Sequence, residues 1–64
     1  MKTGFFDKNG IEIQENDLLK GCFNNEFFKV IYKNNNWIDK DINNGTEMKL
    51  SQALCNYKTV VKSL

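Results

Sequence analysis

The sequence predicts a small all-β fold, a five-stranded SH3-like barrel with one short helical turn before the last strand. Short apolar runs alternate with turns rich in Asn and Gly, which is the pattern of strands joined by tight hairpins. The 64 residues are enough for one domain, 1–64, and contain neither repeat nor linker. An OB-fold also has five strands, but it usually needs a longer chain and a longer helix.

Apolar and β-branched residues mark the expected strands in chain order. These are residues 4–6, 11–13, 18–23, 26–33, 37–39, a fragment at 47–50, and 57–64. The segment 26–33 has the strongest strand composition, because aromatic and β-branched residues favour extended backbone. Asn9 and Gly10 are expected in a hairpin turn with positive φ. Ser51 is the expected cap of a helical turn over residues 51–54.

Side-chain alternation along 26–33 predicts which residues form the core. Phe28, Val30 and Tyr32 share one face, and the lysines of the other face mark it as open to solvent. Leu50 and Leu54 are four residues apart, which would place them on one side of the helical turn. The expected core residues are Ile13, Leu18, Phe28, Val30, Tyr32, Trp37, Leu54 and Val61.

The solvent-facing side of the same strand is the candidate partner-binding site. It carries Phe27, Lys29, Ile31 and Lys33, so apolar groups stand beside charges. An exposed apolar patch on a small protein often marks a contact surface. We therefore expect a protein partner at these four residues. A self-complementary strip would also allow two copies to pair as a homodimer.

The lysines leave a second interpretation open, a single-stranded nucleic-acid site. Lys29 and Lys33 would hold the backbone while Tyr32 and Trp37 stack on bases. Lys58 and Lys62 would join this surface if the last strand lay beside strand 26–33. The net charge of only +1 and the absence of Arg count against duplex recognition. Solvated lysines that protect strand edges are the structural alternative.

The composition argues against an enzymatic function. The chain has no His, so it forms neither a Ser-His nor a Cys-His pair and supplies no His ligand to a metal. Glycosidase-like chemistry needs two carboxylates that face each other, whereas the carboxylates of polar turns are solvated. Residues 39–45 resemble a calcium loop but lack its terminal Glu. We expect a non-enzyme with no cofactor and no metal. The turn carboxylates are Glu12, Glu15, Asp17, Asp39 and Asp41.

The two cysteines predict a reducing compartment. Cys22 and Cys55 form no C-x-x-C motif, and the N-terminus shows no signal peptide. No apolar run approaches the roughly 20 residues that span a bilayer. We expect two free thiols that act as small core residues in the cytoplasm of a bacterial host cell. A disulfide between them is the alternative.

Three segments resemble the YopX family of phage and prophage proteins. Residues 7–20 (DKNGIEIQENDLLK) resemble the opening of that family's C-terminal barrel module. Residues 28–32, followed by Trp37, resemble its central aromatic strand, and residues 50–60 resemble its closing segment. Asn16 stands where the family favours Gly, and Val61-Lys62 stand where the family has Gly-Asn. The resemblance implies an SH3-like barrel of mobile-element origin and carries over no catalytic residues.

These observations combine into one functional expectation. The chain is expected to be a non-enzymatic protein-binding module of phage or mobile-element origin, which masks a surface of a host or phage protein.

Overall fold

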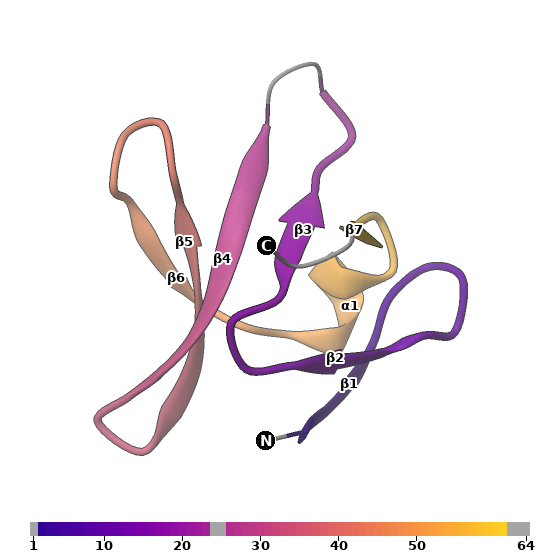
Figure 1. The fold of residues 1–64 in the computed structure, drawn as a ribbon, viewed down its shortest axis with the longest axis horizontal. Helices are drawn as coiled ribbons and strands as arrows, with labels where there is room; N and C mark the ends of the chain where they lie inside the picture. Colours follow the sequence, from indigo (N-terminus) through magenta and orange to yellow (C-terminus); the bar gives the residue numbers. More distant parts are fainter. Residues whose placement is uncertain (1, 24–25, 62–64) are drawn as a thin grey trace.

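The computed structural model describes residues 2–23 and 26–61, which form seven strands and one short helix (Figure 1). The strands are β1 (Lys2–Phe6), β2 (Glu12–Gln14), β3 (Leu18–Lys20), β4 (Phe27–Lys33), β5 (Asn36–Asp41), β6 (Glu47–Lys49) and β7 (Thr59–Val61). The helix α1 (Gln52–Cys55) lies between β6 and β7 in the chain. A mostly β fold with one helical turn is therefore confirmed, with more strands than the five expected.

The described strands form two sheets that do not close into one barrel. β1 and β2 make a hairpin of their own, and the larger sheet has the order β6-β5-β4-β3-β7. All pairings are antiparallel. In Figure 1 the β1–β2 hairpin and α1 lie on the β3–β7 side of the larger sheet. β7 pairs with β3, so β3 lies between β7 and the central strand β4.

Asparagine and glycine set the turns by adopting positive φ. Asn34 (φ 52°) and Asn35 (φ 63°) form the two-residue connection between β4 and β5, as a type I′ hairpin requires. Asn16 has φ 72°, so it adopts the left-handed conformation that glycine also takes. Gly10 has φ 80°, whereas the neighbouring Asn9 does not have positive φ, contrary to the sequence expectation.

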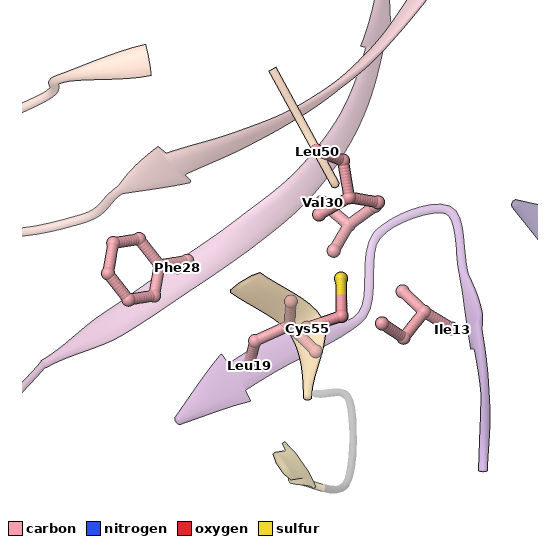
Figure 2. Packing of buried hydrophobic residues seen from close by; sticks show 6 residues of the cluster. All are labelled: Ile13, Leu19, Phe28, Val30, Leu50 and Cys55. Atoms are coloured by element: carbon pink, nitrogen blue, oxygen red, sulfur yellow. The ribbon is translucent and has the colours of Figure 1, made fainter. Parts of the chain in front are cut away.

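The core lies between the larger sheet, the β1–β2 hairpin and α1. Its buried apolar residues are Ile13, Leu19, Phe28, Val30, Leu50 and Cys55. In Figure 2 the Cys55 sulfur points toward Val30 and Ile13, and the Phe28 ring lies to one side of the other five residues. The buried face of β4 was predicted correctly for Phe28 and Val30.

Two of the expected core positions are taken by the next residue in the chain. Leu18 is only half-buried, because pairing of Leu19 with Phe28 puts Leu19 on the core face of β3. Leu54 is 39% exposed. Ser51 has extended backbone and caps α1, so Leu50 lies outside the helix. The spacing of Leu50 and Leu54 therefore does not put them on one helical face. Cys55 takes the buried position on α1 instead.

The end of the β4–β5 hairpin that carries the Asn34-Asn35 turn extends beyond the core. Tyr32 shares the face of Val30 but is 44% exposed, because no described element covers this end. Its ring packs edge-on against Trp37 with 4.8 Å between the centroids. Trp37 and Val61, both expected in the core, are half-buried.

Candidate functional site

The four predicted partner-binding residues lie on one side of β4, opposite the core. Lys29 and Lys33 are exposed, as expected. Phe27 and Ile31 are half-buried, so they are less open than the sequence pattern suggested. Cross-strand neighbours explain this, since Ile31 stands directly opposite Ile38 and Phe27 directly opposite Lys20. The structure thus brings the four residues together on one surface.

Neighbouring strands extend this surface into a lysine-rich face. In an antiparallel sheet, directly opposed residues point to the same side. The register therefore adds residues from β3, β5 and β6 to the two lysines of β4. We call the result the lysine face, the outer side of the five-stranded sheet that bears Lys20, Lys29, Lys33, Lys40 and Lys49. Half-buried apolar residues stand between the lysines: Leu18, Phe27, Ile31, Ile38 and Val61.

The lysine face is strongly positive although the whole chain is nearly neutral. Among the described residues, Glu47 is the one carboxylate that the strand pairings place on this face. Five lysines and one glutamate give 5 − 1 = +4, whereas the chain carries +1. Glu47 pairs with Lys33, with 3.0 Å from Nζ to Oε1. The other four lysines make no ion pair with a described carboxylate.

Two of these lysines oppose each other directly. Lys29 on β4 stands across from Lys40 on β5. Like charges at directly opposed positions destabilise a sheet. A hollow of about 490 Å³ lies beside Lys29, and its other lining residues are Asn16, Leu18 and Ile42. The face therefore combines an unneutralised charge pair with space next to it.

The expected nucleic-acid set is divided between the two faces. Tyr32 and Trp37 lie on the inner side of the sheet, whereas Lys29 and Lys33 lie on the outer side. Lys58 is buried, pairs with Asp39 and stands over a phenylalanine ring, so it does not belong to a basic surface. Lys62 lies outside the described residues. The condition for a four-lysine surface, that β4 and β7 are neighbours, is therefore not met.

The carboxylates at turns have structural roles. Asp39 was expected to be solvated, but it is 2% exposed and bonded to Lys58, because β5 runs through to Asp41 and turns Asp39 inward. Asp41 accepts a hydrogen bond from the Asn43 N–H, and Asp17 accepts one from the Gln14 N–H. In residues 2–23 and 26–61, no three His, Cys, Asp or Glu side chains are grouped to hold a metal ion.

Asp7 is a buried carboxylate that sequence reasoning did not identify. It accepts hydrogen bonds from the N–H groups of Asn9 and Ile11 on one oxygen and from that of Val60 on the other. Burial alone would raise the pKa of Asp7. The backbone hydrogen bonds act in the opposite direction, and their combined effect is larger, so the pKa of Asp7 lies below the ordinary 3.8. The signal was present as the turn sequence Asp7-Lys8-Asn9-Gly10, because an Asp at the start of a turn can accept hydrogen bonds from the turn backbone.

An apolar groove on the inner side was also missed. It measures about 310 Å³, and Phe28 forms part of its lining. Phe23 and Tyr57 on its border are 74% and 67% exposed. Sequence patterning had assigned Tyr57 to a strand and Phe23 to the end of another, where both would have been paired. Further lining residues are Cys22, Met48 and Leu54.

The two cysteines are free thiols, as expected, but they differ in exposure. Cys55 is buried in the core, and burial raises the pKa of its thiol above the ordinary 9.0. Cys22 is exposed and its thiol donates a hydrogen bond to the Tyr57 carbonyl oxygen at 3.2 Å. The prediction of two core residues is therefore wrong for Cys22, because β3 ends at Lys20.

Within the described part of the chain, no helix has the length and apolar character needed to cross a bilayer. Comparison with known proteins gave no matching family model, no matching curated protein and no matching solved structure.

Proposed function

We propose that the chain is a non-enzymatic protein-binding module that masks a surface of a host or phage protein. The lysine face carries this proposal. None of its described residues is buried, whereas the inner side of the same strands holds Leu19, Phe28 and Val30. Among residues 2–23 and 26–61, no element covers this side of the sheet. Half-buried apolar groups between charged ones match the make-up of a protein contact surface.

The sequence supports the origin and architecture of the proposed module. The resemblance of residues 7–20 and 50–60 to the YopX family favours a phage or mobile-element source and an SH3-like arrangement. The helical turn just before the last strand agrees with that arrangement. The absence of His supports a binding role over catalysis. The cytoplasm of a bacterial host is the compartment in which such a module would meet its partner.

A different chain is a better partner than a second copy. Two lysine faces brought together would oppose +4 with +4, and like-charge contacts cost several kcal/mol, by rough estimate. We therefore propose a monomer that binds another protein and does not form a homodimer through this face.

A pull-down from nuclease-treated bacterial lysate tests the proposal. Immobilised wild-type protein should retain a stoichiometric protein partner at moderate salt. Phe27→Asp should lose it, because a charge at this position disrupts an apolar contact on the lysine face. Phe23→Asp is the matched control, since the same change falls on the groove at a site that is already exposed. Circular dichroism must show that both variants are folded.

Three outcomes would contradict the proposal. Capture of no stoichiometric protein would remove its basis. Equal capture by wild type and folded Phe27→Asp would place the contact elsewhere. Loss of capture in Phe23→Asp alone would move it to the groove.

Single-stranded nucleic acid is the second candidate, favoured by the five lysines on one face. Omitting the nuclease tests it: recovery of nucleic acid with no stoichiometric protein would support this candidate and overturn the first.

A further inference from the structure

We infer that the partner presents an acidic protein surface whose carboxylates sit against Lys29 and Lys40. This inference rests on the proposed function and specifies the chemistry of the partner. It is carried by the opposition of these two lysines and by their surroundings on the lysine face.

The first step is the uncompensated charge. Lys29 and Lys40 are directly opposed, and neither makes an ion pair with a described carboxylate. Glu47 stands directly opposite Lys40, yet its carboxylate is bonded to Lys33. A sheet that keeps an unfavourable pair on its open side is more stable when an anion binds between the two amines. Departures from local stability rules are typical of functional positions.

The second step is the apolar frame around these amines. Leu18 stands opposite Lys29 on the β3 side, and Ile31 and Ile38 form the next pair along the hairpin. A partner that covers these side chains excludes water, and charge pairs strengthen in the lower dielectric. The hollow of about 490 Å³ beside Lys29 has room for a carboxylate side chain. Charge and apolar contact therefore act at the same place.

The third step separates protein from nucleic acid. Binding of single strands relies on aromatic rings that stack with bases. Phe27 is the one aromatic residue that the described strands place on the lysine face, and it is half-buried. Leu18, Ile31 and Ile38 provide aliphatic surface, which suits the apolar side chains of a protein. The face is therefore better matched to an acidic protein than to a nucleic-acid strand.

Fluorescence anisotropy with two anionic probes tests the inference. The probes are a labelled oligoglutamate peptide that also contains Leu, and a labelled oligothymidylate of equal net charge. We expect the peptide to bind more tightly at equal salt. Lys29→Glu should weaken peptide binding by at least about tenfold, which is the scale of a lost interfacial charge pair. Lys8→Glu is the matched control, because Lys8 is exposed in the β1–β2 turn.

A second readout excludes misfolding. Lys29→Glu replaces a repulsive pair by an attractive one with Lys40, so its melting temperature should equal or exceed that of wild type. Weaker binding by a protein that is at least as stable supports a functional role for Lys29.

The inference falls if Lys8→Glu weakens peptide binding as much as Lys29→Glu, or if oligothymidylate binds more tightly than the peptide. Lys29→Glu should also be used in the lysate pull-down. A partner that is lost with Phe27→Asp but kept by Lys29→Glu would leave the proposed function standing and overturn the acidic partner alone. Capture of no partner by wild type would instead be a failure of the proposed function.

Discussion

Lys58 and Asp39 form an ion pair on the inner side of the sheet, where they are 9% and 2% exposed. The Lys58 ammonium also stands 4.1 Å from the centroid of the Phe28 ring, so it makes a cation–π contact. The second Asp39 oxygen, Oδ1, is buried without a hydrogen-bond partner among the described residues. This pair joins the residue that precedes β7 to the middle of β5.

Removal of one partner should destabilise the fold strongly. We expect Lys58→Met to lower the free energy of unfolding by about 3–5 kcal/mol, because Asp39 is left as an unpaired buried charge. Urea denaturation followed by circular dichroism measures this. Asp39→Leu combined with Lys58→Met should recover most of the loss, since no buried charge remains. If Lys58→Met alone were as stable as wild type, water would have to reach the Asp39 carboxylate.

Val30 tests the packing of the core. It is fully buried on β4, where it stands directly opposite Asp39 of β5. Val30→Ala should cost about 1–3 kcal/mol, because two methyl groups are lost and the cavity closes incompletely. Ile42→Ala is a control at an exposed position and should stay within roughly 0.5 kcal/mol of wild type. Equal melting temperatures for Val30→Ala and wild type would contradict the assignment of the faces of β4.

Local patterns predicted the parts of the fold that local chemistry determines. Alternation over seven residues assigned Phe28 and Val30 to the buried side of β4. Ser51 caps α1 as expected, with its hydroxyl accepting from the Leu54 N–H. Alternation failed in β3, where Leu18 and Leu19 are adjacent and equally apolar. There the pairing with β4 decides which one is buried, and three residues contain too little pattern to predict it.

The candidate site depends mostly on sheet order, which the sequence did not reveal. Lys29 and Lys33 could be assigned to one side of β4 from alternation alone. The addition of Lys40 and Lys49 requires the register of β5 and β6. The removal of Lys58 from the basic surface requires its contact with Asp39, which is 19 residues away in the chain. Charge in a short segment thus predicts exposure only where no distant partner exists.

The cysteines should react at different rates. In the native protein we expect an aromatic disulfide reagent to modify Cys22 quickly, because it is exposed on the border of the groove. Cys55 should react only after addition of denaturant, because it is buried and its raised pKa leaves little thiolate. Cys22→Ser should remove the fast phase alone. Two equivalents of fast reaction in native protein would show that the core opens readily.

Asp7 should make the stability of the fold depend on acid pH. Its folded-state pKa is lowered from the ordinary 3.8, since the backbone N–H groups of Val60, Ile11 and Asn9 outweigh the opposing effect of burial. A lowered pKa means that the folded state binds the proton less tightly than the unfolded state does. The contribution of Asp7 is therefore complete above the unfolded-state pKa and is lost as the pH falls through the folded-state value.

Asp7→Ala isolates this contribution. At neutral pH the variant should be less stable by about 1–3 kcal/mol, because the N–H groups that bonded to the carboxylate lose their acceptor. Asp17→Ala is the control, since its carboxylate bonds to one exposed N–H group. Melting temperatures measured from pH 7 down through the acid range should bring wild type and Asp7→Ala closer together below the ordinary pKa. A constant difference across that range would show that Asp7 stabilises the turn through packing and not through its charge.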